Sequence, residues 1–200
     1  MIFHTAKLYL GQVCCRQLKL RKASLGILII LLLSFCQNYE NLHLITYLYG
    51  DTKKTVTEYD SKAAYLYYFL KYTKWSNQEN FENYQIGILG EDPFGEKLNI
   101  LIDKTVNDKK ILIHRIKSLD QVSQYQVLFI CESERDRLQN IISVLKNRPI
   151  LTVSDIDGFG DANGMVTFIR HENKVRFKIN NSKIKKSGLS VSSYLLRMSR

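Results

Sequence analysis

Strand-like and helix-like patterns alternate along the middle of the chain, and this order limits the fold more than any other feature. Short apolar runs, each typical of a buried strand, occur at Gln85–Leu89, Lys110–Ile116, Val127–Ile130 and Ile150–Ser154. Helical patterns lie between them at Phe94–Lys104 and Ser133–Asn147. Strands that alternate with helices are typical of a sheet covered on both faces. The sequence therefore predicts an α/β fold with a mostly parallel sheet flanked by helices on both faces.

The C-terminal part of the chain follows a different pattern. Met165–Arg170 and Val175–Ile179 each alternate apolar with polar side chains, and polar residues separate the two runs. An antiparallel hairpin with one buried face is therefore expected. Two short closing helices are expected over Ser182–Leu189 and Val191–Met198. Gly188 separates them, because glycine readily adopts the left-handed conformation found at helix ends.

A further helix is expected at Tyr59–Tyr72, before the first strand. Its apolar stripe recurs at helical spacing and consists of Ala63, Leu66, Tyr67 and Leu70. Asp60 or Ser61 can cap its start. A second edge of this helix carries Tyr65, Tyr68, Phe69 and Tyr72. An edge this aromatic suits contact with protein better than contact with water, so it is predicted to be a surface for self-association or partner binding.

Residues 1–36 have the layout of a secretory signal peptide. They contain basic but no acidic residues, and they include the unbroken apolar run Leu25–Leu33. This run is shorter than the roughly 20 apolar residues that a membrane-spanning helix needs. Cleavage after Cys36 is therefore expected. Lipidation of Cys36 is a weaker alternative because Phe35 precedes it, and a mis-assigned start codon is another. Residues 37–57 are then interpreted as a linker and residues 58–200 as a single domain.

The charge of the chain does not indicate a nucleic-acid partner. The sequence has 29 Lys/Arg and 19 Asp/Glu, and five of the basic residues lie in the predicted signal peptide, which leaves 24 against 19. The basic excess is concentrated after Lys174, where no acidic residue occurs. An exported protein seldom meets nucleic acid, so a solvated basic face is expected there, with an anionic partner or membrane surface as the alternative.

The sequence contains no motif that specifies a reaction. Carboxylates follow the predicted strands at Glu91, Asp92, Asp155, Asp157 and Asp161. They lack the spaced ligands and terminal glutamate of a calcium loop, and aspartate at strand ends is common in turns and helix caps. We therefore expect no catalytic residue, no metal and no cofactor. A small exported ligand-binding protein or hydrolase that uses loops 91–95 and 155–164 is the alternative.

Several ordered segments resemble the YfiR/HmsC-like family of exported bacterial regulators, and the resemblance covers roughly Tyr59–Met198. The family's LTVSD…F…GGM, F-x-IN and S-x-LL segments are matched by Leu151–Asp155, Phe159, Gly164, Met165, Phe177, Ile179, Asn180, Ser193, Leu195 and Leu196. Its K-A-x-x-L-Y-x-F-x-K-x-T-x-W pattern is matched by Lys62, Ala63, Leu66, Tyr67, Phe69, Lys71, Thr73 and Trp75, and its LG-x-D-P-F-G motif by residues 89–95. The family's double glycine is replaced by Asn163-Gly164; among other residues, Asn best tolerates a positive φ.

The resemblance implies a periplasmic regulator without enzymatic activity. Such proteins bind the periplasmic part of a membrane-bound sensor, typically a diguanylate cyclase, and restrain cyclic-di-GMP synthesis. A homodimer is a further option. Partner contact is predicted at Tyr65, Tyr68, Tyr72, Asp92, Phe94, Phe159, Asn163 and Gly164. Cys131 is the one cysteine left after cleavage, so a buried structural thiol is expected, and the bridge that many family members can form is absent.

Overall fold

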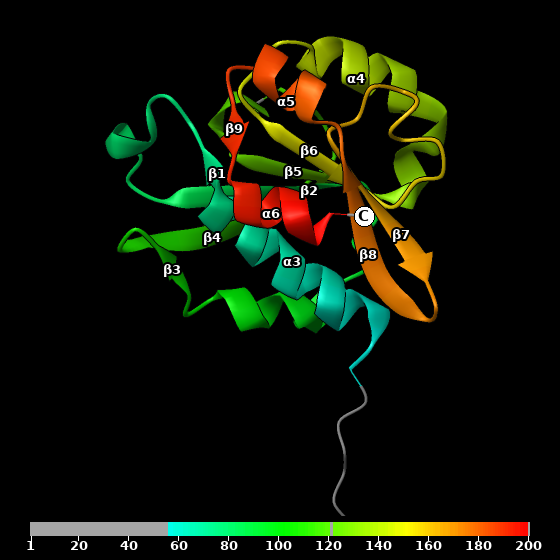
Figure 1. Ribbon diagram of the computed structural model, residues 1–200, viewed down its shortest axis with the longest axis horizontal. Helices are drawn as coiled ribbons and strands as arrows, with labels where there is room; N and C mark the ends of the chain where they lie inside the picture. Colours follow the sequence, from blue (N-terminus) through cyan, green and yellow to red (C-terminus); the bar gives the residue numbers. More distant parts are fainter. Residues whose placement is uncertain (1–55, 121, 200) are drawn as a thin grey trace, which may run out of the picture. The chain divides into compact units, whose positions relative to one another are not determined.

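A sheet of seven strands runs through the part of the chain that the structure describes, residues 56–120 and 122–199 (Figure 1). The predicted signal peptide lies outside these residues, as does the predicted linker apart from residues 56 and 57. Across the sheet, the strands follow the order β3 (Thr105–Val106), β4 (Lys109–Ile116), β2 (Tyr84–Leu89), β5 (Val127–Ile130), β6 (Leu151–Ser154), β7 (Val166–His171) and β8 (Lys174–Ile179). The structure is a computed structural model, and its mixed α/β class agrees with the prediction.

The sheet is mixed, which corrects the expectation of a mostly parallel one. The pairings β4–β2, β2–β5, β5–β6 and β6–β7 are parallel, whereas β3–β4 and β7–β8 are antiparallel. Tight turns cause this difference, because two strands joined by a short turn must run in opposite directions. Asn107 and Asp108 form one such turn, and Glu172 and Asn173 form the other, all four at positive φ. The second turn confirms the predicted C-terminal hairpin.

Two apolar clusters pack on opposite faces of the sheet. The inner strands supply them alternately: Ile86, Ile88, Val127 and Phe129 belong to the first cluster, and Leu89, Leu128 and Ile130 to the second. Helix α3 (Glu58–Tyr72) packs into the first cluster through Ala63, Leu66, Phe69 and Leu70. Helix α4 (Leu138–Leu145) packs into the second through Leu138, Ile141 and Leu145. Helices therefore cover both faces, as predicted.

Helix α3 begins one turn earlier than either predicted cap. Thr57 is its N-cap: the Thr57 side chain accepts a hydrogen bond from the Asp60 backbone at 3.3 Å. Asp60 accepts one in return from the Thr57 backbone at 2.8 Å. This reciprocal arrangement is a capping box, which satisfies two backbone N–H groups that would otherwise lack partners. The hydrogen bonds from Thr57 lower the pKa of Asp60 to about 2.

The remaining helical segments are shorter or tighter than predicted. The helix expected at Phe94–Lys104 is a 3₁₀ helix, η2 (Gly95–Leu101), and a 3₁₀ segment, η4 (Glu132–Arg137), precedes α4. The other 3₁₀ turns are η1 (Gln78–Asn80) and η3 (Val122–Gln124). The closing helices are α5 (Asn181–Lys186) and α6 (Ser193–Met198), with Gly188 between them at φ +74°. Between α5 and α6, β9 (Ser190–Val191) pairs with β1 (Thr73–Lys74), which fastens the end of the chain to α3.

Candidate functional site

A buried lysine on α3 links the helix to the end of strand β6. Lys62 is only 3% exposed, and its Nζ lies 2.5 Å from Asp155 Oδ2 and 2.6 Å from Glu58 Oε1. The Tyr59 hydroxyl donates to the same Asp155 oxygen at 2.9 Å. The Lys62 ammonium also lies 4.3 Å from the centroid of the Tyr59 ring, within range of a cation–π contact. One cation thus holds two carboxylates from distant parts of the chain.

Arg170, on β7, extends this network by pairing with Glu58. The hydrogen bond from Lys62 holds the pKa of Glu58 below its usual value, although burial opposes the effect. Burial, followed by the charge of Asp155, raises the pKa of the Tyr59 hydroxyl well above its usual value. Tyr59 therefore stays a hydrogen-bond donor at physiological pH, and contact with Lys62 and Arg170 favours the ionised form of Glu58. This is the electrostatics of a structural ion-pair network, which favours fixed charges over proton transfer.

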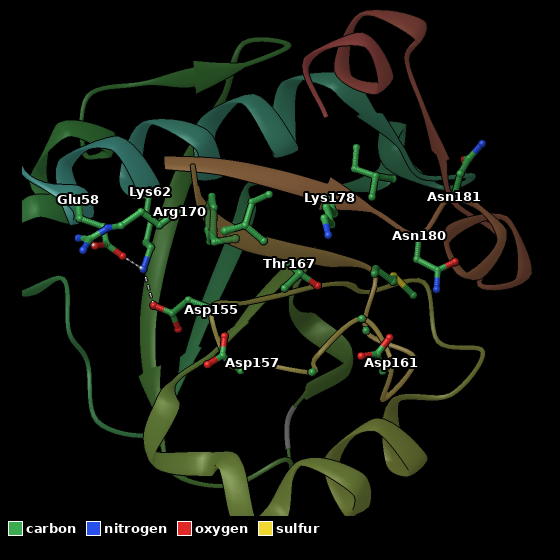
Figure 2. Close-up of a pocket in the computed structure, with 17 residues that line it drawn as sticks. Glu58, Lys62, Asp155, Asp157, Asp161, Thr167, Arg170, Lys178, Asn180 and Asn181 are labelled. Atoms are coloured by element: carbon green, nitrogen blue, oxygen red, sulfur yellow. Dashed lines mark hydrogen bonds and ion pairs between the residues drawn. The ribbon is translucent and has the colours of Figure 1, made fainter. Parts of the chain in front are cut away.

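A cavity of about 840 Å³ opens beside this network, between the loop after β6 and the β7–β8 hairpin (Figure 2). Asp157 and Asp161 line it from the loop, and Arg170 and Lys178 line it from the hairpin. Figure 2 shows Thr167 between these two walls and Asn180 and Asn181 toward the far end. The loop wall is therefore acidic and the hairpin wall basic, although Arg170 is already paired with Glu58, which lines the cavity together with Lys62 and Asp155.

One polar atom beside this cavity lacks a partner. Both hydrogen bonds to Asp155 reach Oδ2, and Asp155 Oδ1 is buried without a hydrogen bond from any residue in the ranges described above. A buried acceptor without a donor is costly, so Oδ1 is a position where a donor from outside the chain would be stabilised. Among residues 56–120 and 122–199, no cluster of three or more His, Cys, Asp or Glu side chains is arranged to hold a metal ion.

Hydrogen bonds to the Asp92 side chain hold the loop at residues 91–95 in place. Asp92 Oδ1 accepts from the Phe94 backbone at 2.8 Å, and Asp92 Oδ2 accepts from Arg115 Nε at 2.7 Å. Phe94 is 2% exposed and packs edge-on against Tyr59 and Phe129 at 5.1 and 4.8 Å between ring centroids. The Phe94 side chain therefore offers no surface to a partner. It fixes the loop against the start of α3.

In the turn at residues 159–164, the Phe159 side chain likewise packs against the protein itself. Phe159 is fully buried, and its ring lies against Gly164 so closely that a Cβ there would overlap the ring. Asn163 adopts φ +72°, the conformation that glycine adopts most readily, which agrees with the expectation that asparagine replaces a glycine at this turn. Gly164 lines the cavity described above, but Phe159 and Asn163 do not.

The aromatic edge predicted on α3 divides into a buried part and an exposed part. Phe69 is fully buried, and Tyr65 packs edge-on against Phe177 at 5.0 Å. Tyr68, which is 36% exposed, stacks on Tyr72 at 6.0 Å. The β7–β8 hairpin covers the first pair, so most of this edge faces the chain's own core. Tyr68 is the member of the edge that presents substantial surface.

The eight predicted contact residues thus fall into separate groups, and the structure does not gather them into one site. Sequence reasoning did not identify Glu58, Lys62, Arg170 and Lys178 as site residues. One signal pointed to Lys62: it falls in phase with Tyr59 and Leu66 on the core-facing side of an amphipathic helix, where a charge requires a buried partner. No local pattern identifies Arg170 or Lys178, because alternating charges are ordinary on a solvent-facing strand.

No helix within the described ranges is long and apolar enough to cross a membrane. A comparison with curated proteins found no match. The model of the YfiR/HmsC-like family matches residues 59–200, which include every strand and helix described above except the first residue of α3. The ordered motifs noted in the sequence, from Lys62 to Leu196, all lie inside the matched range. The chain therefore belongs to the YfiR/HmsC-like family.

Proposed function

We propose that this chain is an exported regulator without enzymatic activity, which docks against the periplasmic part of a membrane signalling protein and restrains a diguanylate cyclase. The match to the YfiR/HmsC-like family carries this proposal, because the family is associated with periplasmic control of cyclic-di-GMP signalling. The apolar run in residues 1–36, which is too short to span a bilayer, supports export.

The mechanism would be thermodynamic linkage. A domain that binds one conformation of a sensor more tightly than another shifts the sensor's population toward the bound conformation. A differential affinity of about 1–3 kcal/mol would change the equilibrium ratio of the two conformations by about five- to 150-fold. The regulator itself needs no catalytic group for this effect, only a surface that fits one state of the partner.

Three aromatic side chains provide a candidate for such a surface. Tyr68 stacks on Tyr72 along α3, and the Tyr72 ring in turn contacts the ring of Tyr194 on α6, with 4.8 Å between the ring centroids. Tyr194 is 47% exposed. We name Tyr68, Tyr72 and Tyr194 the tyrosine surface. Exposed tyrosines are enriched at protein interfaces, since they combine an apolar ring with a hydroxyl that can stay hydrated.

Affinity capture of the full tagged chain from its native host tests this proposal. Periplasmic fractionation and mass spectrometry of the N-terminus would show a processed chain, and capture after detergent extraction would recover a membrane protein with a cyclase domain. Deletion of the gene would raise cellular cyclic-di-GMP, and the wild-type gene would restore it. A chain that stays in the cytosol with residues 1–36 intact, or a deletion that leaves cyclic-di-GMP unchanged, would contradict the proposal.

A ligand-binding role is the second candidate, and the cavity beside Lys62 favours it. Its acidic and basic walls suit a small molecule that carries both charges, and Asp155 Oδ1 lacks a donor. Native mass spectrometry of the chain purified from its host, followed by mild denaturation, would detect such a molecule. Loss of the bound mass in an Asp161→Asn variant, with retention in Asp136→Asn, would place the ligand in this cavity.

A further inference from the structure

Strand β4 has an open edge for most of its length. β2 covers one side of β4 from Ile111 to Ile116, but on the other side the two-residue strand β3 pairs only with Lys109 and Lys110. Beyond Lys110, no further strand pairs with β4 on that side in the described part of the chain. Exposed strand edges are templates for pairing with another chain, because they present unpaired N–H and C=O groups.

The direction of these backbone groups follows from a hydrogen bond at one end of β4 and a strand pairing at the other. The Gly90 N–H donates to the Ile116 carbonyl at 3.1 Å, so the Ile116 carbonyl points toward β2. Successive peptide groups along a strand alternate in direction, so those of Ile111, Ile113 and Arg115 point toward the open side. The tight turn at Asn107–Asp108 agrees with this assignment, because Lys109, in phase with them, pairs toward β3.

A groove runs along this open edge. It has a volume of about 590 Å³ and lies between β4 and the segment that contains η2 and β3. Leu98 and Ile111 form its apolar base, both almost fully buried, and Ile113 is half-buried beside them. Ile102 stands at the rim with 58% of its surface exposed. An added strand would therefore find backbone partners and an apolar floor in the same place.

The charge around this edge favours one kind of added strand over another. Residues 109–117 read KKILIHRIK, with four Lys/Arg and no acidic residue. Lys104, Lys110 and Arg115 line the groove, against one acidic residue, Asp103. Arg115 is paired with Asp92, whereas Lys104 and Lys110 have no ion pair within the described residues. A second copy of β4 would bring lysines against lysines, which disfavours self-pairing. An acidic segment would meet opposite charges instead.

We propose that an extended acidic segment of a partner protein adds to the sheet along β4. Its backbone pairs with Ile111, Ile113 and Arg115, its alternate apolar side chains enter the groove over Leu98, and its carboxylates face Lys104 and Lys110. This inference rests on the proposed function, since it supplies the partner contact that a docking regulator needs. It places that contact on the sheet edge, separate from the tyrosine surface.

A peptide probe tests the pairing directly. The capped peptide (Val-Glu)₄ is titrated into the isotopically labelled, exported chain, and amide hydrogen exchange is followed by NMR. Exchange at Ile111, Ile113 and Arg115 should slow, while Leu112 and His114, already paired with β2, should change little. The same peptide with alternate backbone nitrogens methylated should not bind, because it has lost its donors. Unchanged exchange at the three amides, or equal binding of the methylated peptide, would overturn the inference.

Charge variants provide the matched controls. Lys104→Glu and Lys110→Glu should each weaken binding of (Val-Glu)₄ by about two- to fivefold. Lys185→Glu, an exposed lysine on α5, should leave it unchanged. Equal weakening by all three variants would show a nonspecific effect of net charge and would overturn the inference.

Photocrosslinking in cells separates this inference from the proposed function. A photoreactive residue at Ile102 or at Tyr68 is introduced into the full exported chain. Crosslinks from Ile102 to a membrane protein support the inference. Crosslinks from Tyr68 alone leave the proposed function standing and overturn the sheet-edge contact. Crosslinks from Ile102 to a second copy, or to residues of the same chain, overturn it as well. No membrane crosslink from either position contradicts the proposed function itself.

Discussion

Lys62 and Asp155 form a 2.5 Å ion pair although they lie 93 positions apart in the chain. The pair ties the first turns of α3 to the end of β6, and Glu58 and Tyr59 complete it. Taking a lysine and a carboxylate out of water costs free energy that a direct contact and further hydrogen bonds must offset. Here both are present, so the network holds α3 at the edge of the cavity in one orientation.

Replacement of Lys62 by methionine should destabilise the fold by about 3 kcal/mol, because two carboxylates lose their shared cation. Asp155→Asn should cost less, since Lys62 keeps its contact with Glu58. Urea unfolding followed by circular dichroism measures both. Lys71→Met, at an exposed position of the same helix, should change stability by less than about 0.5 kcal/mol. Equal losses for Lys62→Met and Lys71→Met would contradict a structural role for the pair.

Gly164→Ala should destabilise the chain strongly, because the new Cβ would stand 2.6 Å from Phe159 Cζ and overlap the rest of that ring. A loss of about 3 kcal/mol is expected from forcing a buried ring out of place. Gly158→Ala is the matched control: it also lies in this loop, but its Cβ would meet open space, leaving only the strain of φ +79°, about 1–2 kcal/mol. Thermal unfolding of both variants should give the larger shift for Gly164→Ala, and the reverse order would disprove the packing argument.

The aromatic residues predicted as partner contacts should separate into two classes. Phe94→Ala should cost about 3–5 kcal/mol, because it removes a buried ring from the core. Tyr68→Asp should cost less than about 1 kcal/mol, because Tyr68 is partly exposed. Unfolding curves establish these values before any binding experiment. Only Tyr68→Asp should then be used in partner capture, because loss of binding by Phe94→Ala could result from unfolding. A Phe94 variant that is as stable as wild type would contradict the buried position.

Cys131 should be unreactive in the folded chain. Burial raises the pKa of its thiol to about 12, and nearby carboxylates add to the effect. The unfolded thiol has a pKa of about 8.5. The folded chain therefore binds more protons between these values, and the contribution of Cys131 to stability, complete below about pH 8.5, is lost as pH rises toward 12. Iodoacetamide at pH 8 should label the unfolded chain but not the folded one, and Cys131→Ala should flatten the alkaline loss of stability.

The periodic elements were predictable because their patterns are local. The hairpin, α3, α4 and the inner strands follow from the spacing of apolar residues, and most of their boundaries agree within a few residues. The mixed sheet was missed because the β3–β4 hairpin has only two residues in its first strand, too few for a period to show. The Thr57 cap was missed because the competing caps Asp60 and Ser61 also fit the rule, and only the backbone decides among them.

Sequence patterns also did not show which aromatic residues are exposed in the folded chain. Phe94, Phe159, Tyr65 and Tyr68 all lie in segments that looked suited to partner contact, yet only Tyr68 presents substantial surface. Composition shows that these aromatic side chains favour burial, but it does not show whether the same chain or a partner protein buries them. The β7–β8 hairpin buries Tyr65, and the strands beneath bury the two phenylalanines.

The sequence by itself determined the family, the α/β class and the two faces of the sheet, because these depend on ordered motifs and on the spacing of apolar residues along the chain. The tertiary structure alone decided which charges meet at Lys62, which aromatic rings remain exposed and which strand edge stays open. Each of these depends on contacts between residues far apart in sequence, where side-chain direction and strand order, not local pattern, determine what touches what.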